Sequence, residues 1–269
     1  MVGRGGGKVA GVCADLSEAF PNCLVRPAGS SRDVGEVDAA FLAFSTLSWS
    51  PSVGFNDRQV EAIENFRIVR QLRQEFGRTK FGQICVISNP VDLLARYVSE
   101  QFGSGWVYGL GSTLDARRCR IAVERLWGKT VGELRCIGEH GAHLVPLLSE
   151  ATDRDLPREE YESLRRAVFE SAGQIIRNWA VPLFGPLRCC FEHLDAVFGD
   201  SDVQTTLSTM LTEELYGVCP GIALGVPVRL HRGSLGEVLH LDISEVEQGL
   251  FREAGEFVSS LYQQVLLQV

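Results

Sequence analysis

Three short segments of this 269-residue chain carry side chains whose types and spacing suit proton transfer and the binding of a small carboxylate. In one of them, Asp115 and Arg118 lie three residues apart in a stretch of helical period, so they would share one helix face. We expect that face to be buried as it continues through Ala122 and Leu126. A guanidinium there could bind a carboxylate through two parallel hydrogen bonds, while the aspartate anchors an imidazole. The alternative is a local ion pair on a solvated surface.

His140 is the candidate acid/base group, because imidazole titrates near neutral pH. It stands in Gly138-Glu139-His140-Gly141, just past a predicted strand. The flanking glycines let the backbone turn sharply and leave the ring accessible. The alternative is a structural histidine in a loop, which is the role we expect for His143, His193, His231 and His240.

Asn89 follows another predicted strand directly. In a parallel α/β sheet, ligands bind in the crevice at the carboxyl ends of the strands, so the position of Asn89 suits a binding residue. The alternative is that Ser88-Asn89-Pro90 is only a turn that ends the strand, since all three residue types favour turns.

The composition describes an ordinary globular chain, with 45% hydrophobic and 22% charged residues. Its length suits one large domain or two closely associated ones. No apolar run approaches the ~18 residues that a membrane span needs, and the N-terminus does not resemble a signal peptide, so we expect a cytoplasmic protein with no membrane partner.

Charge and cysteine usage exclude further classes. The chain has 26 basic and 34 acidic residues, a net charge of −8, and no long basic block, so we expect no nucleic-acid partner. The eight cysteines form no C-x-x-C pair, and we expect neither disulfides nor a metal site.

Short β-branched runs alternate with segments of helical period, which predicts parallel strands covered by helices. Ser244 and Glu247 form the spacing of a capping box that would open a final helix. The other expected elements are strands at 83–88, 106–109 and 134–138, helices at 57–76, 114–127 and 158–179, a further helix ending near 197, and a β-meander within 221–243.

Together the three segments resemble signatures of the lactate/malate dehydrogenase family. The matching residues are Ser88-Asn89-Pro90-Val91-Asp92, Leu114-Asp115-Ala116-Arg117-Arg118 and Gly138-Glu139-His140-Gly141, followed in the same order by Leu207–Met210, Leu215–Gly217 and Leu224–Pro227. The resemblance covers residues 55–269 well and earlier residues less well. It implies an α/β fold, with an incomplete Rossmann-type parallel sheet over 1–109 and an α+β catalytic domain over 110–269.

The resemblance also implies hydride transfer between NAD and a small 2-keto or 2-hydroxy acid, in an enzyme that forms homo-oligomers. His140 would be the proton donor and acceptor, oriented by Asp115. Arg118 would clamp the substrate carboxylate. Asn89 would contact the cofactor ribose or a substrate oxygen. Arg58 matches the mobile-loop arginine that polarises the substrate carbonyl, although it could also be an ordinary first-turn helix residue.

The N-terminal cofactor-binding half departs from the family pattern. Members have a strand, a glycine-rich loop and a helix whose N-terminus cradles the cofactor diphosphate. Here Gly3, Gly5 and Gly7 are the candidate loop glycines, with a helix expected over 9–20. Only two residues precede Gly3, so no complete strand fits there.

Further departures affect specificity. A strand is expected at 23–25, and Arg26 follows it where the family has an acid that binds the adenosine ribose, which would favour NADP or mean that ribose recognition is lost. The segment after Arg26 is short and lacks a family helix and the strand after it. The position that separates lactate from malate specificity in the family falls near Ser52, so neither substrate is encoded. Ala142 and Pro182 also replace usual family residues.

Two hypotheses of different class follow, with a third that concerns the chain itself. The first is an NAD(P)-dependent 2-hydroxyacid dehydrogenase. The second is a catalytically impaired dehydrogenase-like domain that serves as a scaffold or binding module, because the cofactor loop is degenerate. The third is a truncated or alternatively spliced product that lacks the first strand.

Overall fold

The computed structural model describes residues 1–3, 6–44, 58–103, 106–152, 156–178, 182–200, 202–231 and 234–269. Gly5 and Ser52, which the sequence analysis singled out, lie outside these residues. Within the described residues, no helix has the length and apolar character needed to span a membrane.

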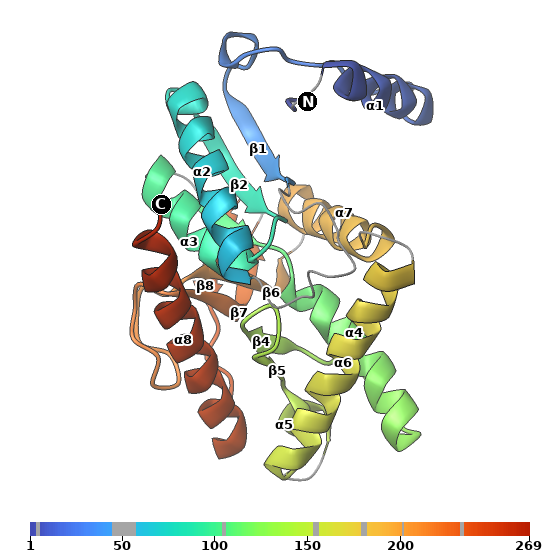
Figure 1. The fold of residues 1–269 in the computed structure, drawn as a ribbon. Helices are drawn as coiled ribbons and strands as arrows, with labels where there is room; N and C mark the ends of the chain where they lie inside the picture. The colour runs from blue at the N-terminus through green and yellow to red at the C-terminus, as the bar shows by residue number, and fades with distance from the viewer. Residues whose placement is uncertain are drawn as a thin grey trace.

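A continuous mixed sheet runs through the molecule (Figure 1) in the order β1-β2-β3-β6-β7-β4-β5, with β8 paired to β7. The parallel strands are β1 (Val37–Leu42), β2 (Phe81–Val86) and β3 (Trp106–Gly109). The antiparallel strands are β4 (Cys136–Gly138), β5 (Leu144–Pro146), β6 (Val203–Met210), β7 (Ala223–His231) and β8 (Ser234–Val238). The predicted α/β fold with a Rossmann-type parallel part is confirmed. The division at residues 109 and 110 stays a prediction, although all parallel strands precede it.

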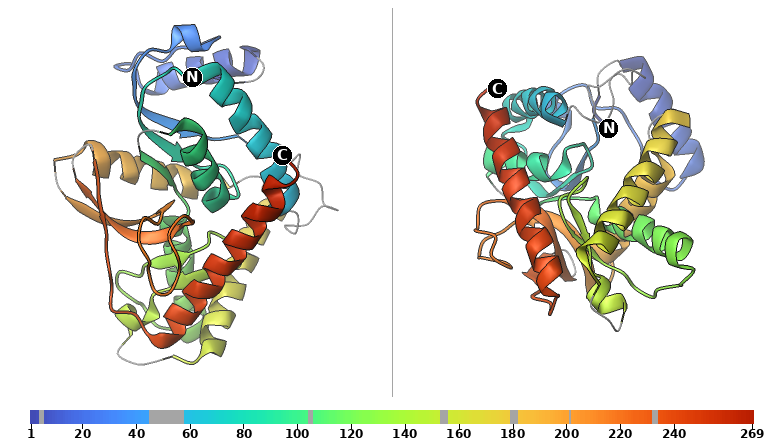
Figure 2. Two further views of the ribbon diagram at one scale, coloured as in Figure 1. Left: turned by 90° about the vertical axis from the view of Figure 1, so that its left-hand side faces the viewer. Right: turned by 60° about the horizontal axis from the view of Figure 1, so that its bottom comes forward.

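Two groups of helices cover the sheet (Figures 1 and 2). One group contains α2 (Arg58–Phe76), α3 (Val91–Phe102) and α8 (Glu245–Leu266), which contact one another. In the other group, α4 (Ser112–Trp127) contacts both α6 (Arg158–Asn178) and α7 (Phe184–Phe198). The remaining helices are α1 (Gly6–Ala19), a 3-10 turn (Ser31–Asp33) and the short α5 (Leu148–Ala151).

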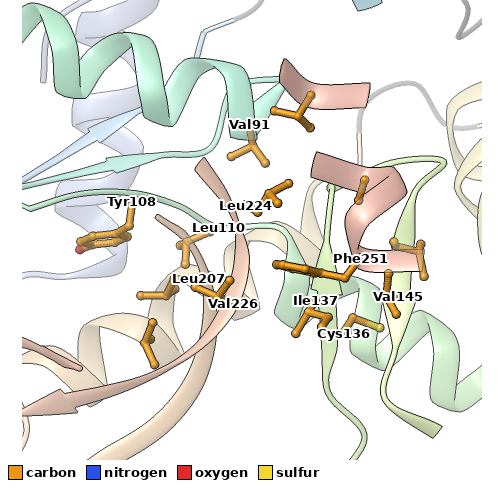
Figure 3. Close-up of a cluster of buried hydrophobic side chains, with 14 of the residues drawn as sticks. Val91, Tyr108, Leu110, Cys136, Ile137, Val145, Leu207, Leu224, Val226 and Phe251 are labelled. Carbon is orange, nitrogen blue, oxygen red and sulfur yellow. The ribbon is translucent and has the colours of Figure 1, made fainter. Parts of the chain in front are cut away.

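The hydrophobic core lies between the sheet and these helices. Figure 3 shows part of it, in which Phe251 of α8 lies near Ile137 of β4 and Leu224 of β7. Each of these three side chains is at most 1% exposed, so each contributes about 2 kcal/mol or more by leaving water.

The predicted capping box at the start of α8 is confirmed. The Ser244 hydroxyl accepts a hydrogen bond from the Glu247 N–H, and the Glu247 carboxylate accepts one from the Ser244 N–H. The same buried carboxylate accepts from Ser149 N–H at 2.9 Å and from the Tyr161 hydroxyl at 3.0 Å. One acidic side chain therefore connects α8 to α5 and α6.

The N-terminal region differs from the prediction in two ways. The expected strand at 23–25 is wrong, because these residues are irregular and Leu24, at 85% exposed, has no core to enter. The family strand expected to be missing between Arg26 and α2 is the second difference. A strand, β1, lies there and pairs with β2, with Val37 opposite Phe81. The β1 residues do not alternate in polarity, so no period-2 pattern marks this strand.

The prediction that Leu126 is buried is also wrong. This side chain is 46% exposed, whereas Ala122 and Val123 are buried. The buried face of α4 therefore ends before its last turn, and Leu126 is partly exposed to solvent.

His193 belongs to a buried polar chain between α7 and the sheet. The Tyr108 hydroxyl donates to Gln83 Oε1, so His193 Nε2–H must donate to the tyrosine oxygen, at 2.6 Å. His193 Nδ1 is buried without a hydrogen-bond partner among the described residues. Burial lowers the pKa of His193 from 6.5 to about 4, so the ring is neutral at pH 7.

The depressed pKa of His193 predicts loss of stability in acid. Because the unfolded chain binds this proton near pH 6.5 and the folded chain only near pH 4, the stabilisation is complete above pH 6.5 and falls as the pH drops towards 4. The loss attributable to His193 should reach about 3 kcal/mol by pH 4. Chemical denaturation at several pH values measures the free energy of unfolding. Over this pH range, that free energy should fall by about 3 kcal/mol less in His193→Gln than in wild type. Parallel pH dependence in the two proteins would contradict the assignment.

Candidate active site

The carboxyl ends of β2, β3 and β4 bring the three candidate segments together. Ser88 and Asn89 follow β2, Gly111 follows β3 and opens α4, and His140 follows β4. The end of β1 is fastened to the same region, because Leu42 O accepts from Ile87 N–H at 2.9 Å. The crevice expected at this edge of the sheet therefore contains side chains from all three loops.

His140 and Asp115 form the central contact of the site. Asp115 lies in the first turn of α4, and its Oδ2 is 2.6 Å from His140 Nδ1. Since a carboxylate only accepts, Nδ1 carries the proton and Nε2 is the nitrogen left for a ligand. The side chains are 14% exposed for His140 and 4% for Asp115.

The charge of Asp115 determines how His140 titrates. Burial by itself would lower the pKa of His140, and the positive charges of Arg58 and Arg118 act in the same direction. The Asp115 charge and hydrogen bond outweigh these effects, so the pKa of His140 is raised above its ordinary value of 6.5. A raised pKa favours the protonated ring that an acid catalyst needs.

Arg118 contacts the other carboxylate oxygen of Asp115. One guanidinium nitrogen lies 3.4 Å from Asp115 Oδ1, and the Arg118 side chain is 14% exposed. No other hydrogen-bond partner of Arg118 occurs among the described residues, so its remaining N–H donors can serve a ligand. The structure therefore places Asp115, Arg118 and His140 together.

Arg58 is the first residue of α2 and interacts electrostatically with the same loop. It lowers the pKa of His140 and also that of Glu139. Burial alone would raise the pKa of Glu139, but hydrogen bonds from His143 and the Arg58 charge outweigh burial and lower it. Arg58 is thus near the candidate acid/base group.

Asn89 presents a buried acceptor with no partner. Its backbone oxygen accepts from Asn65 Nδ2 at 2.6 Å, which fixes the residue in place. Its side-chain Oδ1 is buried and has no hydrogen-bond partner among the described residues. Such an atom costs free energy unless a ligand or water donates to it, so Asn89 Oδ1 suits ligand binding.

The candidate cofactor residues near the N-terminus lie in a separate region, since Figure 1 places α1 at the far end of the molecule from β4. Met1 N donates to Arg26 O at 2.9 Å, and Ala28 N donates to Met1 O at 2.8 Å. A Cβ on Gly3 would lie 2.9 Å from Val9, and Gly7 falls in the first turn of α1. Gly3, Gly7 and Arg26 are therefore near one another, while Arg26 itself is exposed.

Sequence reasoning assigned no role to two residues that shape the site. A Cβ on Gly111 would lie 2.5 Å from the His140 ring, so this glycine lets the ring lie against the backbone. Asp92 accepts a hydrogen bond from the His140 N–H at 2.8 Å. Asp92 stood within the Ser-Asn-Pro-Val-Asp segment, which was the available signal. No cluster of metal-ligating side chains occurs in the described part of the chain.

Comparison with known proteins identifies relatives but no matching family model. The chain is 28% identical over 276 aligned residues to an L-2-hydroxycarboxylate dehydrogenase (NAD(P)(+)) of Methanocaldococcus jannaschii, covering 96% of this chain and 87% of that protein. It is 28% identical to a malate dehydrogenase of Methanothermobacter thermautotrophicus, covering 88% and 78%. Among solved structures, malate dehydrogenase from Archaeoglobus fulgidus in complex with NADH matches with a TM-score of 0.80 and 21% identity, over 96% of this chain and 87% of that one.

Gly111→Ala should displace His140. The new Cβ would lie 2.5 Å from the ring, closer than real contacts allow, so the ring or the backbone must shift, and we expect this shift to weaken the contact with Asp115. Histidine NMR spectra should then show a lower His140 pKa. Gly132→Ala is the control, since its Cβ would meet nothing within 4 Å. An unchanged His140 titration in Gly111→Ala would contradict this packing.

Asp115→Asn should lower the pKa of His140. The substitution removes the charge that raises this pKa and leaves burial and the two arginines to depress it. Titration of the imidazole by NMR measures the change. The matched control is Asp202→Asn, which alters the exposed contact between Asp202 and His231 Nδ1 and should not affect His140. Equal His140 titration in wild type and Asp115→Asn would show that Asp115 does not control the ring.

Proposed function

Because this chain belongs to the lactate/malate dehydrogenase family, we propose that it is an NAD(P)-dependent oxidoreductase that interconverts a small 2-keto acid and the corresponding 2-hydroxy acid. The observation that carries the proposal is the 2.6 Å contact between His140 and Asp115 beside Arg118. The names of the two sequence relatives support the same reaction class. We also propose that the protein is located in the cytoplasm.

His140 supplies and removes the proton. In the reductive direction, protonated Nε2 donates to the substrate oxygen at C2 while Nδ1–H stays bonded to Asp115. In the oxidative direction the neutral ring accepts the hydroxyl proton at the same nitrogen. Asp115 holds the ring orientation throughout and stabilises the imidazolium.

Two arginines act on the substrate. Arg118 binds the substrate carboxylate through its remaining N–H donors, in a partly desolvated position where such a pair is strong. Arg58 places a second positive charge near His140 and polarises the keto oxygen as negative charge develops there. These roles select a carboxylate with an adjacent carbonyl.

Two groups of residues would hold a nicotinamide dinucleotide, one beside His140 and one near the N-terminus. Asn89 Oδ1, a buried acceptor with no partner in the described residues, would receive a donor from the nicotinamide riboside half. Gly3, Gly7 and the N-terminus of α1 would hold the diphosphate, because the free N–H groups at a helix N-terminus bind anions. Exposed Arg26 would suit a 2′-phosphate. When bound, this cofactor supplies or accepts the hydride at C2 of the substrate.

A homo-oligomer is the assembly we propose. The outer face of α7 leaves large apolar side chains exposed, including Phe184 at 73% and Phe191 at 52%, and a second copy could cover them. Light scattering after size exclusion measures the assembly, and a monomer at all concentrations would contradict this part of the proposal.

Arg118→Leu should abolish recognition of the keto acid. The expected result is a fall in kcat/KM of about 1,000-fold or more with unchanged NADH affinity, because a desolvated carboxylate loses its clamp. NADH oxidation with pyruvate and with oxaloacetate measures the effect. Arg120→Leu changes an exposed arginine on the same helix; it is the control and should retain activity.

His140→Asn should abolish turnover, because the variant lacks the imidazole that transfers the proton. If wild type neither binds nor oxidises NADH, the dehydrogenase proposal fails and the scaffold hypothesis takes its place.

A further inference from the structure

Asp92, in the first turn of α3, carries a carboxylate buried between two other elements and is only 1% exposed. Its Oδ2 accepts from the backbone N–H of His140 at 2.8 Å, and its Oδ1 accepts from the Ser208 hydroxyl of β6 at 2.6 Å. Both carboxylate oxygens are therefore used, and both hold a neighbouring element in place.

The loop that carries His140 is attached to the protein on two sides. The ring is fixed from α4 by Asp115 Oδ2, and the backbone of the same residue is fixed from α3 by Asp92 Oδ2. Within the loop, Glu139 accepts from His143 N–H at 2.8 Å and keeps the turn compact, but this bond does not connect the loop to α3. The position of the imidazole therefore depends on where α3 and α4 hold Asp92 and Asp115.

We propose that Asp92 is a positioning residue, which sets the place of His140 so that Nδ1 meets Asp115 and Nε2 faces the substrate. This inference rests on the proposed function. Asp92 does not touch the reacting atoms and acts only through the His140 backbone. Since displacement of a reacting group by about 1 Å can cost about 100-fold in rate, a backbone hydrogen bond can control turnover.

The hydrogen bond to His140 does not depend on the charge of Asp92. Burial and the negative charge of Glu139 raise the pKa of Asp92 to about 7, against the hydrogen bonds from Ser208 and His140 and the charge of His140. When Asp92 is protonated, its proton can lie on Oδ1 and point to the Ser208 oxygen, because a hydroxyl also accepts. Oδ2 then still accepts from His140 N–H.

This geometry separates two substitutions. In Asp92→Asn, the amide oxygen can accept from His140 N–H while the amide nitrogen donates to the Ser208 oxygen, so both contacts persist. In Asp92→Ala both are lost. We therefore expect the asparagine variant to keep His140 in contact with Asp115 and the alanine variant to release it.

The test uses the full chain and two readouts. NMR titration without added ligand should show a His140 pKa that falls further in Asp92→Ala than in Asp92→Asn. Both variants lose the Asp92 charge, which favours protonated His140, but only the alanine variant also loses the contact with Asp115. Steady-state kinetics should show kcat reduced about 100-fold in Asp92→Ala with the KM for NADH unchanged, and kcat within about threefold of wild type in Asp92→Asn. Thermal unfolding identifies variants that do not fold.

The two readouts distinguish the possible failures. If the wild-type chain has no turnover but the His140 titrations follow the expected pattern, the proposed function fails and the positioning role stands. If wild type is active and folded Asp92→Ala keeps the wild-type His140 pKa and kcat, the positioning role is wrong. If Asp92→Ala does not fold, Asp92→Asn decides alone, and a kcat loss of about 100-fold in that variant overturns the inference.

Discussion

The site depends on the hydrogen bond between His140 Nδ1 and Asp115 Oδ2. At 2.6 Å and with the carboxylate side chain 4% exposed, it offsets the cost of burying an imidazolium and fixes which ring nitrogen faces a substrate. The surrounding structure serves this contact. Gly111 leaves room for the ring, Asp92 holds the backbone, and Arg118 satisfies the second oxygen of Asp115.

The parallel part of the sheet is small for its proposed task. A complete Rossmann sheet has two mononucleotide-binding halves, whereas the described residues supply only β1, β2 and β3 as parallel strands. Among the described residues, no further strand joins β1 on the side away from β2. Met1 instead exchanges backbone hydrogen bonds with the irregular segment at Arg26 and Ala28. The surroundings of His140 are thus more completely built than the parallel sheet that would hold a nucleotide.

The sequence predicted the parts of the structure that local patterns encode. The strand at 106–109 and the capping box of α8 followed from residue pattern and spacing, and the approach of Asp115 to His140 followed from the resemblance to the dehydrogenase family. The role of Asp92 did not, because its partners Ser208 and His140 lie 116 and 48 residues away in the chain. The error at 23–25 has a similar origin, since a short apolar run forms a strand only where a neighbouring strand and a core accept it.

Fluorescence titration with NADH, in the absence and presence of oxamate, tests most directly whether His140, Asp115 and Arg118 form a functioning site. Oxamate is an isostere of pyruvate that offers a carboxylate to Arg118 and a carbonyl oxygen to His140. We expect oxamate to tighten NADH binding about tenfold or more, a coupling that should disappear in Arg118→Leu. NADH binding that oxamate leaves unchanged in the wild-type chain, or no NADH binding at all, would contradict the account.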